Sequence, residues 1–141
     1  MTPLVVDASV VVKWFVPEIH TDAARRWLDV AHQFFAPDLL FAETANTVWK
    51  KVRRSELTRD QGQQLVVDLA DVAVETVSCR ALAKDAYVLA AAMGRSVYDA
   101  LYLALAVRLD TRLITADERF VAGVAGFREL RARVIHVTSG G

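Results

Sequence analysis

Four acidic residues are the strongest candidates for chemistry in this sequence: Asp7, Glu43, Asp99 and Asp117. Asp7 follows the apolar run 3–6 and Asp117 comes just after the apolar run 113–115, and short β-branched runs of this kind are typical of buried strands. Asp99 and Glu43 fall in the early turns of two predicted helices, where the helix dipole favours a negative charge. Because open parallel sheets bind their ligands beyond the carboxyl ends of the strands, we expect all four carboxylates at one edge of a sheet.

Carboxylates gathered in this way would repel one another, at a cost of several kcal/mol per close pair for an effective dielectric constant of about 20. A cation between them removes the repulsion, and oxygen ligands without cysteine or paired histidine select a hard ion, Mg²⁺ or Mn²⁺. Such an ion stabilises charge on a transferring phosphoryl group and activates a water as nucleophile. Each helix-borne or loop acid also has a structural interpretation: Asp99 as part of a capping box with Ser96, Asp117 as the N-cap of the next helix, and Glu43 as a solvated helix residue.

Strands and helices alternate along the whole chain. The apolar runs predict strands at 3–6, 33–36, 74–77, 113–115 and 134–137. Capping residues and apolar repeats predict helices over about 9–15, 22–31, 38–54, 58–72, 81–93 and 98–109. This alternation predicts a five-stranded parallel sheet with right-handed crossovers and helices on both faces, a three-layer α/β/α sandwich. From the length of 141 residues we expect one domain over 1–141.

The helix predicted over 38–54 has a recognisable apolar repeat. Phe41, Ala45, Val48 and Val52 recur at the spacing of a buried helix face. Glu43 falls on the opposite, hydrophilic side. We therefore expect this helix to bury those four residues and to present Glu43 to solvent or to a polar site.

Composition excludes several classes of protein. With 54% apolar and 24% charged residues, the chain is typical of a compact soluble protein, and no run approaches the roughly 20 apolar residues of a membrane span. We expect a cytoplasmic protein without a membrane partner, because the start of the chain lacks the features of a secretory signal. The single Cys79 excludes an internal disulfide and a multi-cysteine zinc site. His20, His32 and His136 lack metal-like spacing and are interpreted as structural or surface residues, and Tyr102 as a core aromatic residue.

The charge distribution bears on nucleic-acid binding. Lysines plus arginines number 17, as do aspartates plus glutamates, and a net charge of zero argues against a nucleic-acid partner. If a metal site sequesters four of the acids, 13 remain against 17 basic residues, and the basic ones are clustered. Lys50, Lys51 and Arg54 end the helix that carries Glu43, and Lys13 extends the strip. These side chains are candidate RNA phosphate contacts, with a solvated helix end as the alternative.

The sequence resembles the PIN-domain ribonucleases and, more narrowly, the VapC toxins of bacterial and archaeal toxin–antitoxin modules. Each acid stands in a short segment that matches the family in order and context, and the resemblance spans essentially the whole chain. The segments are Asp7-Ala8-Ser9 after a strand, Phe41-Ala42-Glu43 in a helix, Tyr98-Asp99-Ala100 opening a helix, and Thr115-Ala116-Asp117 after a strand.

The resemblance implies a sheet order of 3-2-1-4-5, with Asp7 beside Asp117. It makes the four acids the catalytic and metal-binding cluster, with Asp7 and Asp99 first among the direct ligands of Mg²⁺ or Mn²⁺. Ser9 and Thr115 match positions whose hydroxyl groups support the site, with ordinary capping as the alternative for both. The implied activity is endonucleolytic hydrolysis of RNA to 5′-phosphate and 3′-hydroxyl ends. The implied partners are an RNA substrate, a second copy in a homodimer, and a cognate antitoxin whose helical tail blocks the acidic site.

Other classes of phosphoryl-transfer protein fit the sequence less well. An aspartyl-phosphate enzyme with its nucleophile after the first strand needs a second acid two residues later, where this chain has Ser9. A receiver domain needs its aspartate after the third strand, which here runs into Ser78 and Cys79. No glycine-rich run precedes a lysine and a serine or threonine, so a phosphate-binding loop is excluded. The alternative that stays open is a non-catalytic RNA- or protein-binding module on the same scaffold.

Overall fold

A five-stranded, fully parallel sheet forms the centre of the computed structural model, which describes residues 1–139. The strands are β1 (Thr2–Val6), β2 (His32–Pro37), β3 (Val74–Val77), β4 (Leu113–Thr115) and β5 (Val134–His136). Their spatial order is β3-β2-β1-β4-β5, and every neighbouring pair is parallel. The predicted sheet order is therefore confirmed, and β1 lies beside β4.

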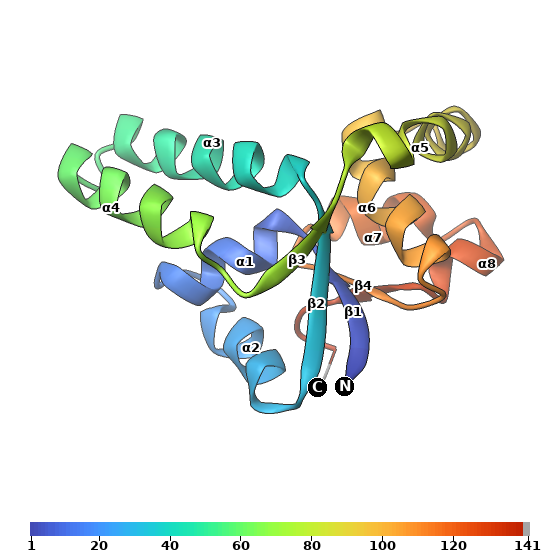
Figure 1. The fold of residues 1–141 in the computed structure, drawn as a ribbon, viewed down its shortest axis with the longest axis horizontal. Helices are drawn as coiled ribbons and strands as arrows, with labels where there is room; N and C mark the ends of the chain where they lie inside the picture. Colours follow the sequence, from blue (N-terminus) through green and yellow to red (C-terminus); the bar gives the residue numbers. More distant parts are fainter. Residues whose placement is uncertain (140–141) are drawn as a thin grey trace.

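Two groups of helices cover the two faces of the sheet. The first group is α1 (Ala8–Phe15), α2 (Thr21–Arg26), the short turn η1 (Trp27–Asp29), α3 (Leu39–Arg53) and α4 (Arg59–Ala70). The second is α5 (Cys79–Met93), α6 (Val97–Arg108), α7 (Glu118–Val124) and α8 (Arg128–Arg131). The strand order runs from β1 outward to β3 and then reverses towards β5, so right-handed crossovers place the two groups on opposite faces. Figure 1 shows α1 to α4 on one side of the strands and α5 to α8 on the other, which confirms the three-layer sandwich.

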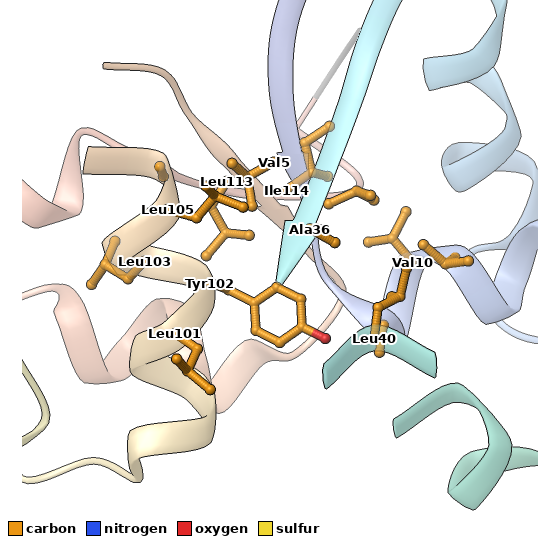
Figure 2. Close-up of a cluster of buried hydrophobic side chains, with 14 of the residues drawn as sticks. Val5, Val10, Ala36, Leu40, Leu101, Tyr102, Leu103, Leu105, Leu113 and Ile114 are labelled. Carbon is orange, nitrogen blue, oxygen red and sulfur yellow. The ribbon is translucent and has the colours of Figure 1, made fainter. Parts of the chain in front are cut away.

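The core surrounds β1 and includes side chains from helices of both layers, with α6 contributing the longest buried run. Leu4, Val5 and Val6 are almost completely buried, as a strand covered on both faces should be. On α6 the whole run from 100 to 106 is buried, so this helix has no polar face over that length. Figure 2 shows Leu103 and Leu105 of α6 in the cluster that also holds Val5. Burial of each such side chain stabilises the fold by about 1.5–3 kcal/mol. The helix α6 is therefore a rigid support for its first turn, which carries Asp99.

The predicted buried face of α3 was correct at Val48 and wrong at Phe41 and Ala45. The helix buries Leu40, Thr44 and Val48, while Phe41 is 37% exposed and Ala45 is only partly buried. α3 extends past the end of the sheet and packs against α1 and α4 instead of lying flat on the strands (Figure 1). Its buried stripe is therefore set by neighbouring helices, and it is rotated by about one residue from the stripe that apolar spacing predicted.

Two further features of the helices bear on the predictions. Thr58 and Gln61 form a capping box at the start of α4, in agreement with the helix predicted from residue 58, and both reciprocal hydrogen bonds are present. Over residues 1–139, no single helix is long and apolar enough to cross a membrane. α5 and α6 reach that length and composition only as a pair, and they are bent by 114°.

A candidate metal centre at the carboxyl edge of the sheet

One pocket holds all four predicted acids. It has a volume of about 340 Å³ and lies where β1 and β4 end. Its walls include Asp7, Glu43, Asp99 and Asp117, together with Ser9, Lys13 and Lys50. The acids come from four segments that are far apart in the sequence, and it is the parallel order of β1 and β4 that brings them to one edge.

Asp7 sits at the bottom of this arrangement, held by two hydroxyl groups. Its Oδ2 atom accepts hydrogen bonds from Ser9 Oγ at 2.7 Å and Thr115 Oγ1 at 2.8 Å. Ser9 and Thr115 in turn accept the backbone N–H groups of Ala116 and Asp117, both at 3.0 Å. Ser9 lies inside the first turn of α1 and does not cap it, because the N-cap position belongs to Asp7. The two hydroxyls therefore tie the end of β1 to the end of β4 and orient one carboxylate.

Burial raises the pKa of the Asp7 carboxyl above its ordinary value of 3.8. The hydrogen bonds from Ser9 and Thr115 oppose this shift, and the negative charges of Asp99 and Asp117 add to it. Asp7 is thus a carboxylate that the fold supports with hydrogen bonds and at the same time surrounds with like charge. A cation in the pocket would favour its ionised form.

Glu43 on α3 is held by Tyr102, which crosses from the opposite layer. The Tyr102 hydroxyl donates to Glu43 Oε1 at 2.5 Å. In Figure 2 the ring extends from α6 past the end of β2, with its oxygen directed towards the start of α3 near Leu40. Burial raises the pKa of Glu43, the hydrogen bond from Tyr102 lowers it, and the charges of Asp7 and Asp99 raise it further.

Tyr102 is buried, as the sequence predicted, but its contact with Glu43 was not foreseen. Burial and the nearby carboxylates raise the pKa of Tyr102 far above its ordinary range, so the phenol stays a hydrogen-bond donor. The spacing in the sequence held one signal for this role. Tyr102 is three residues after Asp99 and so lies on the same face of α6.

Asp99 carries an ion pair that the sequence analysis also missed. Its Oδ2 atom accepts from Arg95 Nη2 at 2.7 Å and from Arg95 Nε at 3.2 Å. The guanidinium also donates to the backbone oxygen of Arg119 and lies 5.3 Å from the centre of the Phe120 ring. Gly123 leaves the room for it, since a Cβ there would come within 2.6 Å of the arginine side chain. The spacing of four residues between Arg95 and Asp99 was the available signal.

The structural interpretations of Asp99 and Asp117 are both partly present. Ser96 Oγ accepts the Asp99 N–H at 3.1 Å, but the Asp99 carboxylate turns to Arg95, so the capping box is not closed. Asp117 is the N-cap of α7, and its Oδ1 accepts from the N–H groups of Arg119 and Phe120. Asp99 contributes only its backbone N–H to the first cap, and Asp117 contributes only its Oδ1 atom to the second. Both residues still line the pocket.

The donor set of this pocket fits a hard divalent cation. Every candidate ligand is a carboxylate oxygen, and Asp7 and Glu43 each feel the charge of Asp99. Within residues 1–139 no three of the acids bring their oxygens within 4.8 Å of one another. The fit to a hard cation therefore rests on the chemistry of the donors and on the pocket that they share, and the carboxylates do not form a preformed coordination shell.

The predicted basic residues divide into two groups. Lys50 is exposed and lines the acidic pocket, and Arg54 is exposed at the end of α3. Lys13 is only 7% exposed, and both it and Lys51 pair with Glu18, at 3.3 and 3.5 Å. Of the predicted strip, Lys50 therefore combines exposure with a position at the pocket, while two of the lysines share a carboxylate partner.

The fold and the pocket define a class: a three-layer α/β protein with acidic side chains from four segments at the carboxyl edge of a parallel sheet. Comparison with known proteins gives the family. The sequence model of the PIN domain matches residues 4–123, which include all four acids. Ribonuclease VapC3 of Pyrobaculum aerophilum is 36% identical over 118 residues, which cover 82% of this chain and 90% of that protein. The chain belongs to the PIN-domain family.

Solved structures have the same fold at low sequence identity. PAE2754 from Pyrobaculum aerophilum matches with a TM-score of 0.67 and 20% identity, over 96% of this chain and 84% of that one. A toxin–antitoxin complex from Klebsiella pneumoniae matches with a TM-score of 0.66 and 18% identity, over 95% and 97% of the two chains. VapBC2 from Rickettsia felis, bound to a DNA fragment from its promoter, matches with a TM-score of 0.62 and 13% identity, over 96% and 98%.

Proposed function

We propose that this chain is an endoribonuclease that depends on Mg²⁺ or Mn²⁺ and acts in the cytoplasm as the toxin of a toxin–antitoxin module. One observation carries the proposal: four carboxylates from separate segments line a single pocket at the sheet edge where ligands of parallel α/β proteins bind. Membership of the PIN-domain family and the similarity to Ribonuclease VapC3 support the same activity.

In this proposal each residue of the pocket has a distinct task. Asp7, Glu43, Asp99 and Asp117 would hold the divalent ion, with Asp7 and Asp99 first among its direct ligands, and the bound ion would stabilise charge on the scissile phosphate and lower the pKa of a water. Ser9 and Thr115 fix the orientation of Asp7 through its Oδ2 atom. Tyr102 fixes Glu43 in the same way, through Oε1. Glu43, with a pKa raised by burial, is suited to accept the proton of the attacking water.

RNA would approach the pocket along α3. Lys50 lies at the rim and would bind the phosphate next to the scissile bond, and Arg54 lies one turn further along the helix. Lys13 and Lys51 are both paired with Glu18, so they would contribute to RNA binding only on release from that carboxylate. The contacts are electrostatic, so binding is expected to weaken steeply with salt.

We further propose that the chain forms a homodimer and binds a cognate antitoxin. Two of the structural matches are proteins solved as toxin–antitoxin assemblies. On this chain, α3 and α4 enclose a groove of about 1050 Å³ that exposes apolar side chains, among them Trp49 (53% exposed), Val66 and Val67. An amphipathic antitoxin helix would bury these side chains in the groove.

An RNA cleavage assay tests the enzymatic proposal. Purified protein incubated with structured RNA should cleave it in Mg²⁺ or Mn²⁺, and EDTA should stop the reaction. Asp7→Asn should abolish cleavage, while Asp85→Asn, which changes an exposed acid on α5, should leave it intact. Cleavage that persists in Asp7→Asn or in EDTA would mean that the activity comes from another source.

The Arg95–Asp99 ion pair favours one second candidate, a non-catalytic RNA- or protein-binding module. A carboxylate that is held by an arginine is a poorer metal ligand, because the arginine already satisfies its charge. The same assay separates the two functions. RNA that binds in a gel-shift experiment, but is not cleaved in any divalent metal by the wild type or by Arg95→Ala, would support the binding module.

A further inference from the structure

Three side chains outside the acidic pocket come together from distant parts of the chain. His20 precedes α2, Glu118 lies in the first turn of α7, and His136 ends β5. One ligating atom of each lies within 4.8 Å of those of the other two. The two imidazole rings meet edge to face, with their centres 5.6 Å apart. In the described part of the chain, no other three His, Cys, Asp or Glu side chains satisfy this spacing.

His136 has a polar atom that its surroundings leave without a partner. Its Nδ1 lies 2.7 Å from the Thr138 hydroxyl, and the Thr138 N–H reaches the same nitrogen at a longer 3.3 Å. Its Nε2 is buried and has no hydrogen-bond partner within residues 1–139. A buried polar atom in this state destabilises the fold unless a partner satisfies it. Metal binding at Nε2 requires the tautomer that is protonated on Nδ1, in which Nδ1 donates to the Thr138 hydroxyl in place of the longer contact from the Thr138 N–H.

The other two side chains are not committed to competing partners. His20 occupies the N-cap position of α2 in a left-handed conformation, with φ of 64°, yet its side chain makes no capping hydrogen bond. Glu118 is exposed, and none of the salt bridges formed within residues 1–139 includes it. Both are therefore free to turn towards His136.

We propose that His20, Glu118 and His136 bind a Zn²⁺ ion, at a site that shares no ligand with the acidic pocket. Two imidazoles and one carboxylate are ligands for zinc and related transition metals, whereas Mg²⁺ prefers oxygen ligands alone. Ligands about 2.0–2.2 Å from a tetrahedral ion stand about 3.4 Å apart, so each pair of atoms needs to close by no more than about 1.5 Å. Side-chain rotation is sufficient for that movement.

The bound ion would tie three segments together beside the acidic pocket. His136 pairs in register with Thr115 on β4, and Glu118 directly follows Asp117. His20 and Thr138 also line a separate pocket of about 450 Å³, through which the ion can reach solvent. We therefore expect Zn²⁺ to hold the segment between α1 and α2, which carries His20, to the end of β5 and to the start of α7.

Metal binding to the full, untagged chain tests this proposal. Protein freed of metal with a chelator is titrated with ZnCl₂ by calorimetry, and with Co²⁺ by visible absorption, which reports tetrahedral coordination. We expect one Zn²⁺ per chain, not displaced by excess Mg²⁺. His20→Ala and His136→Ala should each weaken binding by at least about tenfold. Zn²⁺ should raise the melting temperature of the wild type and not that of these variants.

Matched variants make the outcome unambiguous. His32→Asn, which changes the remaining histidine, and Asp7→Asn, which changes the acidic pocket, should both bind Zn²⁺ as the wild type does. Glu118→Gln provides the same test at an exposed position if His136→Ala does not fold. Absence of binding to the wild type, unchanged binding in the ligand variants, or loss of binding in Asp7→Asn would each overturn the proposal. The measurement involves no RNA, so it stands apart from the proposed nuclease activity.

Discussion

The hydrogen bond from Tyr102 to Glu43 gives the sharpest test of the proposed site, through the variant Tyr102→Phe. The substitution keeps the buried ring and removes only the hydroxyl that donates to Glu43 Oε1 at 2.5 Å. A hydrogen bond to a charged group contributes about 1.5–3 kcal/mol, which corresponds to a fall of about 10- to 150-fold in kcat/KM if it acts fully in the transition state. The ring continues to fill the core, so we expect the stability loss to be limited to that of the hydrogen bond, about 1.5–3 kcal/mol.

The pH profile identifies the cause of that fall. Tyr102 lowers the pKa of Glu43, so without the hydroxyl this pKa rises further above its ordinary value of 4.5. A base must be ionised to accept a proton, and the acidic limb of the rate profile should therefore move to higher pH in Tyr102→Phe.

The assay is initial-rate RNA cleavage across pH, with Tyr87→Phe as the matched control because Tyr87 is 66% exposed on α5. Melting curves check that each variant is folded. If Tyr102→Phe retains kcat/KM within twofold of the wild type and an unmoved acidic limb, the assignment of Tyr102 as the residue that positions Glu43 is refuted.

Three further predictions follow from the charges of the site. Burial raises the pKa of Asp7 in the folded state, so the metal-free fold binds more protons than the unfolded chain and loses stability as pH rises from about 4. Asp7→Asn should reduce this loss and stabilise the metal-free protein at pH 7 by about 0.5–2 kcal/mol. Equal melting temperatures of the variant and the wild type at pH 7 would contradict this prediction. Arg95→Ala releases its aspartate partner and should raise Mg²⁺ affinity about fivefold in a calorimetric titration, whereas a weaker affinity would mean that the arginine supports the metal site. Lys50→Ala should weaken RNA binding and lower its salt dependence by about one phosphate contact, while Lys51→Ala, which removes a partner of Glu18, should do so less; equal effects in filter binding across a salt series would count against the proposed path of the RNA.

Much of the fold follows from local signals that need no tertiary information. The runs at 74–77 and 113–115 became β3 and β4 with the predicted bounds, because β-branched runs between helix signals have few alternatives. The capping box of Thr58 and Gln61 placed the start of α4 for a similarly local reason. Alternation of strand and helix then determined a parallel sheet, since right-handed crossovers exclude most other topologies.

Local patterns were less informative where an element leaves the sheet. The core face of α3 was predicted from the spacing of Phe41, Ala45, Val48 and Val52. Of these only Val48 is fully buried, and the helix buries Leu40 and Thr44 beside it. A helix that packs on a sheet buries its most apolar stripe. The helix α3 packs mainly against α1 and α4 instead, and the sequence of α3 does not encode where those helices lie. The same limit applied to Tyr102, whose polar end meets Glu43 across two layers of the structure.

The sequence by itself determined that this chain has carboxylates at strand ends and helix starts, because those positions are defined by neighbours within a few residues. Only the tertiary structure decided which side chains meet. It placed Thr115 against Asp7, brought Tyr102 to Glu43, and joined His20 to His136, a pair separated by more than a hundred residues and without any spacing motif. Contacts between segments this distant depend on strand order and layer packing, and these are properties of the whole chain.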